Sequence, residues 1–245
     1  MTDLKQQLKD AQVELERVRD EYQEFAYIVS HDLFGALRQV EGFAKIVSAK
    51  NADGLDEKTH RHLGLILEGS EKGKKILEAL LDFSRLNTTD APFTSVDCNA
   101  VAEDVLSELA DLAQAKEAQI TCGKLPVIIA YKPMITRVFY NLILNALTYH
   151  PANDPPQISI TSTSETDHWS FLIQDSGIGM KEANKDKIFK PLRRGVGKGF
   201  GDGMGMGLAT AKKILERHGG HISVESELSM GAAFTFTVSK DLEID

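Results

Sequence analysis

The chain has 245 residues, of which 42% are hydrophobic and 26% charged, as expected for one or two domains with buried cores. Its formal net charge of −8 argues against a nucleic-acid-binding protein, because such a protein needs a basic face. No apolar run approaches the ~18–20 residues of a membrane span, and the N-terminus lacks the apolar core of a signal peptide, so we expect a cytoplasmic location.

The first 32 residues repeat apolar side chains with the 4-3 spacing of a coiled-coil seam. One series takes every seventh residue from Leu4 to Phe25, and the other takes every seventh residue from Leu8 to Val29. The alternative is a single amphipathic helix packed on the protein's own core, but the sustained period and the charged flanks favour two strands. His31 falls at a g position beside this seam, where we expect its side chain to be open to solvent.

A helical hairpin is predicted for the next part of the chain. The first helical pattern breaks at 50–57, where an Asp-Gly pair indicates a turn, and a second apolar stripe runs from Leu63 to about Leu86. Two such hairpins related by a twofold axis form a four-helix bundle, so we expect a homodimer. The polar stretch 87–97, which contains a proline, is interpreted as a linker.

Beyond the linker, helical and strand patterns alternate, which predicts an α+β two-layer sandwich. We expect a helix over 99–116 capped by Asp97 or Asn99, a second helix with Pro133 in its first turn, and a third over about 206–218. Residues 180–204 lack a clear pattern, and a loop of this length is usually functional or disordered. The expected strands cover 127–130, 157–164, 168–174, 221–226 and 232–238.

Two glycine-rich motifs in this second domain predict a nucleotide pocket. The first, DSGIGM at 175–180, follows a predicted strand, and the carboxylate of Asp175 could accept the exocyclic amine of adenine. Gly177 and Gly179 would let the backbone approach a ligand closely. The second, GMGMGL at 203–208, opens a helical pattern, so its amides could bind phosphate oxygens. Each motif alone is more often a turn, but their order and separation favour a pocket.

A third element lies upstream, where Asn141 and Asn145 share one face of a predicted helix. Such a pair alone is more often a satisfied core amide than a metal site. Followed by DSGIGM, by IFKPL at 188–192 and by GMGMGLA, however, the pair resembles the N, G1, F and G2 boxes of sensor histidine kinases, which belong to the gyrase-type ATPase superfamily. FAYIVSHDLFGAL at 25–37 resembles the phospho-acceptor box of that family, in the form typical of phytochrome-type kinases.

The resemblance extends from about residue 20 to the C-terminus and implies a protein-histidine kinase of two-component signalling that uses ATP and Mg²⁺. It implies autophosphorylation of His31, with Asp32 as its acid–base partner, and phosphotransfer to the receiver domain of a response regulator. Asn145 would be the protein ligand of Mg²⁺. The implied ATP-binding residues are Asn141, Asn145, Tyr149, Asp175, Gly177, Gly179, Gly203, Gly205, Gly207 and Leu208.

The implied domains are a coiled-coil segment (1–24), a dimerisation and histidine phosphotransfer domain (25–90) and a catalytic ATP-binding domain (91–245). Gly35 departs from the family, because many members carry Thr or Asn four residues after the acceptor, and phosphatase activity is therefore in doubt. One alternative is a non-catalytic dimeric phosphotransfer adaptor with a vestigial ATPase domain, which the intact glycine motifs disfavour. Another is a serine-directed anti-sigma kinase, but that class has no helical hairpin bearing a histidine.

Overall fold

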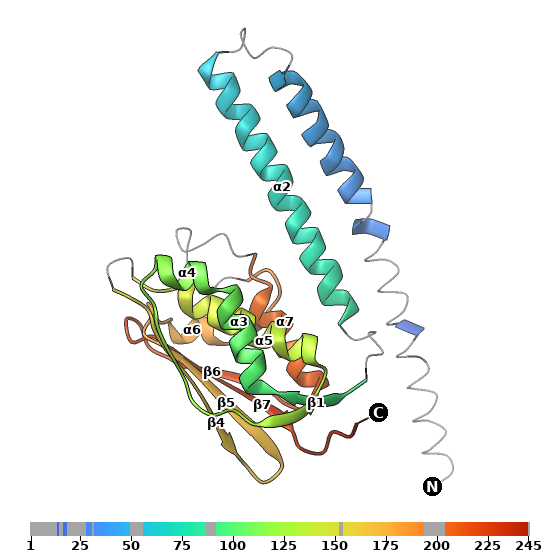
Figure 1. Cartoon of the computed structure of the whole chain (residues 1–245). Helices are drawn as coiled ribbons and strands as arrows, with labels where there is room; N and C mark the ends of the chain where they lie inside the picture. The colour runs from blue at the N-terminus through green and yellow to red at the C-terminus, as the bar shows by residue number, and fades with distance from the viewer. Residues whose placement is uncertain are drawn as a thin grey trace. The chain divides into compact units, whose positions relative to one another are not determined.

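The chain divides into two compact units, Met1–Thr88 and Thr89–Asp245 (Figure 1). Within the part that the structure describes, no helix is both long and apolar enough to cross a membrane. His31, Gly203 and all the heptad positions except Val18 and Val29 lie outside the described residues. The computed structural model describes residues 14, 17–18, 28–30, 32–49, 56–86, 92–151, 154–193 and 204–244.

Two long helices of the first unit lie in the part of the chain that the structure describes, and they run antiparallel (Figure 1). Residues 32–49 are helical, and α2 covers Glu57–Arg85. The Ser70 hydroxyl of α2 donates a hydrogen bond to the backbone carbonyl of Leu37 at 2.9 Å. Gly73 lies against the same residue, since a Cβ there would meet Cδ1 of Leu37 at 3.0 Å. The prediction of a helical first domain is therefore confirmed.

The second unit is built on a five-stranded sheet with the strand order β2-β4-β5-β7-β6. β2 runs parallel to β4, and the other neighbours are antiparallel. A separate antiparallel pair joins β1 (Thr94–Asp97) to β3 (Val127–Ala130). The strands of the large sheet are β2 (Gln119–Cys122), β4 (Gln157–Ser164), β5 (His168–Asp175), β6 (Ile222–Ser226) and β7 (Ala232–Ser239).

The larger helices of this unit cover one face of the sheet (Figure 1). The rings of Phe171 on β5 and Phe236 on β7 stack with centroids 4.7 Å apart, and Phe139 of α5 meets both edge-on. This aromatic cluster fixes the layer of helices to the sheet and confirms the predicted two-layer α+β domain. The helices are α3 (Cys98–Glu108), α4 (Ala110–Ala115), α5 (Lys132–Thr148), α6 (Glu182–Lys185), the 3₁₀ helix η1 (Lys187–Phe189) and α7 (Gly207–Arg217).

The structure differs from the prediction at one helix, which is divided into two shorter ones, and at two short strands. The helix predicted over 99–116 breaks at Leu109, whose backbone (φ −93°, ψ 6°) separates α3 from α4. Strands β1 and β2 were not predicted, and β1 lies within the stretch that was interpreted as a linker. Three of the four residues of β1 are exposed, as are three of the four in β2, so neither shows the alternating pattern of a half-buried strand.

His218, at the end of α7, is fully buried and uses both ring nitrogens. Nδ1 lies 2.7 Å from the carbonyl oxygen of Ile214, while Nε2 accepts the backbone N–H of Tyr131 at 3.2 Å. The Phe93 ring meets the imidazole edge-on at 5.1 Å. Burial lowers the pKa of His218 and the charge of Arg217 lowers it further, against the opposing effect of the Ile214 hydrogen bond. The neutral ring is therefore favoured in the fold, although a helix C-terminus favours positive charge.

We expect the second unit to lose stability as the pH falls below about 6.5, the ordinary pKa of histidine. Because the folded pKa of His218 is lowered, the unfolded chain binds more protons there. The contribution of His218 is therefore complete above this value and is lost as the pH falls through the lowered folded pKa. Trp169, the single tryptophan, lies in β5, so thermal unfolding of this unit can be followed by its fluorescence.

The matched variant is His218→Gln, whose amide keeps one donor and one acceptor but does not titrate. Between about pH 7 and pH 5, its unfolding temperature should fall less steeply than that of the unmodified chain. Equal slopes for the two proteins would show that His218 does not carry the effect.

Candidate nucleotide-binding site

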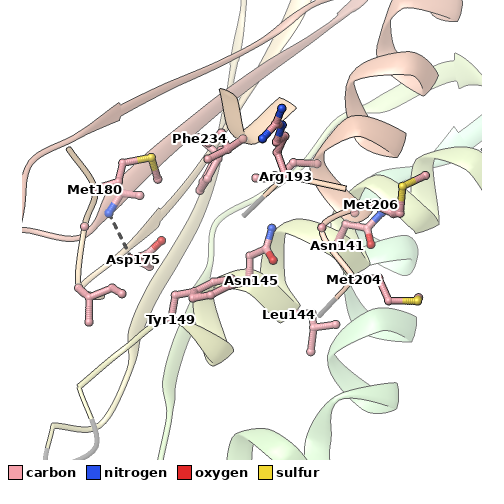
Figure 2. Close-up of a pocket in the computed structure, with 17 residues that line it drawn as sticks. Asn141, Leu144, Asn145, Tyr149, Asp175, Met180, Arg193, Met204, Met206 and Phe234 are labelled. Atoms are coloured by element: carbon pink, nitrogen blue, oxygen red, sulfur yellow. Dashed lines mark hydrogen bonds between the residues drawn. The ribbon is translucent and has the colours of Figure 1, made fainter. Parts of the chain in front are cut away.

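A pocket in the second unit brings the asparagine helix and both glycine motifs together (Figure 2). The side chains of Asn141, Asn145 and Tyr149 follow one another along α5 and its C-cap, and Asp175 at the end of β5 lies across from them (Figure 2). The start of α7 completes the lining. The predicted residues that line the pocket are Asn141, Asn145, Tyr149, Asp175, Gly179, Gly205, Gly207 and Leu208.

Asp175 is buried, with 9% of its surface exposed, and its carboxylate is oriented by the backbone. Oδ1 accepts the N–H of Gly177 at 2.8 Å and the N–H of Ala232 at 3.1 Å. Burial raises the pKa of Asp175, and these two hydrogen bonds oppose the rise. Because both donors are directed to Oδ1, the second oxygen, Oδ2, is left to accept a hydrogen bond from a ligand.

The other end of the pocket offers hydrogen-bond donors. The side-chain Nδ2 of Asn141 is buried and has no hydrogen-bond partner among the described residues. Its Oδ1 lies beside Gly207, where a Cβ would meet it at 3.0 Å. The first amides of an α-helix have no acceptor within the helix, and at α7, which begins at Gly207, no side-chain cap supplies one. An unpaired amide and an uncapped helix start fit the oxygens of a phosphate group.

The two glycines of the first motif are required by the protein's own backbone. A Cβ at Gly177 would overlap the carbonyl oxygen of Tyr149, which accepts the N–H of Ile178 at 2.9 Å. Gly179 has φ +61°, and a Cβ there would overlap the carbonyl oxygen of Glu227. The sequence predicted that these glycines make room for a ligand, whereas at both positions the space is taken by another backbone segment. Gly177 is buried and is not among the residues that line the pocket.

Several lining residues were not predicted. Met180, Met204 and Phe234 add apolar side chains on different sides of the pocket, and Arg193 adds a cationic one (Figure 2). Ile188 is a further apolar lining residue. Met180 and Met204 lie inside the quoted motifs, so their position in sequence was a usable signal. Phe234 contributes because β7 pairs with β5 beside Asp175, and this strand order does not follow from the sequence pattern.

The predicted phospho-acceptor region belongs to the first unit. His31 lies outside the described residues, while Asp32 is exposed on the helical stretch 32–49. Gly35 has no described atom within 4 Å of the place where its Cβ would lie, so packing within the hairpin does not require glycine there. Among the residues that the structure describes, no cluster of three or more His, Cys, Asp or Glu side chains could hold a metal ion.

Comparison with known proteins agrees with this arrangement. Residues 131–242, which contain every residue that lines the pocket, match the family described as histidine kinase-, DNA gyrase B-, and HSP90-like ATPase. Over 92% of its length the chain is 33% identical to cyanobacterial phytochrome A of Nostoc sp., of which it covers 29%. Over 96% of its length it is 26% identical to the methanogenesis regulatory histidine kinase FilI of Methanothrix harundinacea, of which it covers 26%.

The fold is also similar to that of full-length ShkA in its crystal structure with AMPPNP. The TM-score is 0.66 and the sequence identity 21%, over 90% of this chain and 47% of that one. The chain thus spans less than a third of the two curated relatives and about half of this structure.

Proposed function

Because the chain belongs to the sensor histidine kinase family, whose transmitter core it matches, we propose that it is a protein-histidine kinase that phosphorylates itself on His31 with ATP. The observation that carries this proposal is the polarity of the pocket. One end presents a buried carboxylate oxygen, and the other presents an unpaired amide donor and an uncapped helix start. A molecule with an amine at one end and phosphates at the other would match this arrangement of acceptor and donors.

In this proposal Oδ2 of Asp175 accepts the exocyclic amine of adenine, since Oδ1 already accepts two backbone donors. Nδ2 of Asn141 and the first amides of α7 bind the phosphate oxygens. Asn145, one turn along α5 from Asn141, would hold Mg²⁺ through its amide oxygen, the remaining ligands being phosphate oxygens and water. When bound, Mg²⁺ neutralises charge on the phosphates during transfer.

The imidazole of His31 then attacks the γ-phosphorus, the bond between this phosphorus and the bridging oxygen of the β-phosphate breaks, and ADP leaves. Asp32 holds the imidazole in the reactive tautomer and takes up its proton. Phosphohistidine would then transfer its phosphoryl group to an aspartate of a response-regulator receiver domain. A cytoplasmic location is part of the same proposal, because ATP is its substrate.

The test is incubation of the whole chain with γ-labelled ATP and Mg²⁺. A kinase should acquire label that is lost in acid and kept in base, as phosphohistidine is. A chain that acquires no label while a labelled phosphodonor still transfers to it would instead be a phosphotransfer adaptor with a vestigial ATPase domain.

We also propose that the hairpin of the first unit dimerises into a four-helix bundle. Leu33, Val40 and Val47 recur every seven residues along the first helix, and each has at least 40% of its surface exposed. Phe43 on the same helix is 68% exposed, and α2 exposes Ile66 as well. Such an apolar face on a helical hairpin is typical of a surface that a second copy covers.

The unmodified chain should therefore sediment as a dimer at micromolar concentration, and Phe43→Asp should weaken that dimer by at least about 100-fold. Burying one phenylalanine contributes about 1.5–3 kcal/mol, and the twofold axis doubles the loss. Ala49→Asp, on another face of the same helix, is the control and should leave the dimer intact. A monomeric unmodified chain, or equal effects of both substitutions, would contradict the proposed bundle.

A further inference from the structure

We infer that Ser226 is a positioning residue for adenine recognition, acting through the two backbone donors that orient Asp175. This inference rests on the proposed ATP site. Ser226 is not among the residues that line the pocket, so it would act on the base only through Asp175. Its hydroxyl forms hydrogen bonds to two backbone segments that lie next to Asp175.

Ser226 is the last residue of β6, and its hydroxyl makes two hydrogen bonds to the backbone. The hydroxyl donates to the carbonyl oxygen of Gly231 at 2.6 Å and accepts the N–H of Met180 at 3.0 Å. Gly231 belongs to the turn between β6 and β7, whereas Met180 ends the first glycine motif. One side chain therefore links two backbone segments that are about 50 residues apart in the sequence.

Both linked segments carry a donor to Asp175. Ala232 directly follows Gly231, and its N–H bonds to Oδ1 of Asp175 at 3.1 Å. Gly177 lies in the same motif as Met180, and its N–H bonds to the same oxygen at 2.8 Å. The hydroxyl of Ser226 thus holds each donor segment beside the carboxylate.

The strand register places these residues in one row across the sheet. Ser226 of β6 is paired with Ala232 of β7, and Ala232 is paired with Asp175 of β5. The backbone of Gly231 packs so closely on Asp175 that a Cβ at Gly231 would overlap the carbonyl oxygen of Asp175. A displacement of the backbone at Ser226 should therefore also displace Asp175, the residue proposed to bind the adenine amine.

The β6–β7 turn makes a second contact with the motif. The N–H of Ser229 bonds to the carbonyl oxygen of Ile178 at 2.8 Å, so the turn stays attached when the Ser226 hydroxyl is removed. We expect Ser226→Ala to leave the domain folded but to leave Met180 N–H without its acceptor and Gly231 without its donor. The donors to Asp175 would then be less fixed, and Oδ2 would be less well placed for the adenine amine.

The experiment measures nucleotide affinity of the whole chain by calorimetry with two probes. One is ATP, and the other is purine riboside triphosphate, which carries hydrogen in place of the adenine amine. Ser226→Ala should raise the Kd for ATP by about 5- to 30-fold, the effect of losing buried hydrogen bonds, and the Kd for the analogue by less than about twofold. Ser226→Thr keeps the hydroxyl and should restore ATP binding.

Ser223→Ala is the matched control, because Ser223 is an exposed serine on the same strand and should change neither Kd. Fluorescence of Trp169 checks that each variant is folded. If Ser226→Ala does not fold, Ser226→Cys is tested in its place, because its thiol is a weaker hydrogen-bonding group. It should likewise raise the Kd for ATP more than the Kd for the analogue. Equal losses for the two nucleotides, or an unchanged Kd for ATP, would overturn the inference.

Failure of the proposed function would be recognised separately. The unmodified chain is titrated with ATP first, and absence of binding there would refute the ATP site itself. Binding by the unmodified chain, together with no selective loss in the variants, would refute the role of Ser226 alone.

Discussion

Replacing His31 by glutamine should reduce transfer of label from γ-labelled ATP to background, while the Kd for ATP changes by less than about twofold. Glutamine has no nitrogen that can attack the γ-phosphorus, so the phosphoryl group has no acceptor. Binding should persist because the pocket residues all belong to Thr89–Asp245, whereas His31 belongs to the first unit. Acid-labile, base-stable label measures the reaction, and calorimetry measures the affinity.

Two other histidines provide matched controls for this prediction. His60 and His62 are exposed on α2, in the same unit as His31. Glutamine at either position should leave labelling unchanged, because neither lies in the motif that resembles the phospho-acceptor box. Full acid-labile labelling of His31→Gln, with loss of labelling in His60→Gln or His62→Gln, would show that the acceptor is on the second helix.

The elements that could be predicted from sequence are those with long and regular patterns. Strands β4 and β5 extend over 157–164 and 168–175, where the sequence predicted 157–164 and 168–174. Helix α7 begins and ends one residue inside its predicted range of 206–218. Each of these elements packs one face on a single core, so its apolar residues follow the period of its backbone.

The parts that could not be predicted depend on contacts between distant segments. The second donor to Asp175 is the backbone N–H of Ala232, which is 57 residues away and carries no side-chain signal. The same holds for Ser226, because its hydroxyl can make its two hydrogen bonds only when the fold brings β6, the β6–β7 turn and the first motif together. The sequence predicted that Asp175 belongs to a pocket, and it does line one, but the sequence could not show how the backbone fixes the direction of its two carboxylate oxygens.

Because the backbone fixes the orientation of the Asp175 carboxylate, Asp175→Asn tests the proposed role of this residue in the pocket. The asparagine oxygen must take the place of Oδ1, because only an acceptor can satisfy the N–H groups of Gly177 and Ala232. The amide NH₂ group is then forced to the position of Oδ2, where it presents a donor to the amine of adenine. The variant loses the charged acceptor and leaves the adenine amine without a partner. This loss weakens binding by about 1.5–3 kcal/mol, so the Kd for ATP should rise by roughly 10- to 150-fold.

The same geometry predicts which nucleotide the variant should prefer. Inosine triphosphate carries a carbonyl oxygen where adenine carries its amine, so it should bind Asp175→Asn more tightly than it binds the unmodified chain. Asp167→Asn, at an exposed carboxylate just before the opposite end of β5, should change neither affinity. Calorimetry with both nucleotides therefore separates lost recognition from a damaged fold, since damage would weaken both. If Asp175→Asn bound ATP as tightly as the unmodified chain, the adenine would have to be recognised elsewhere.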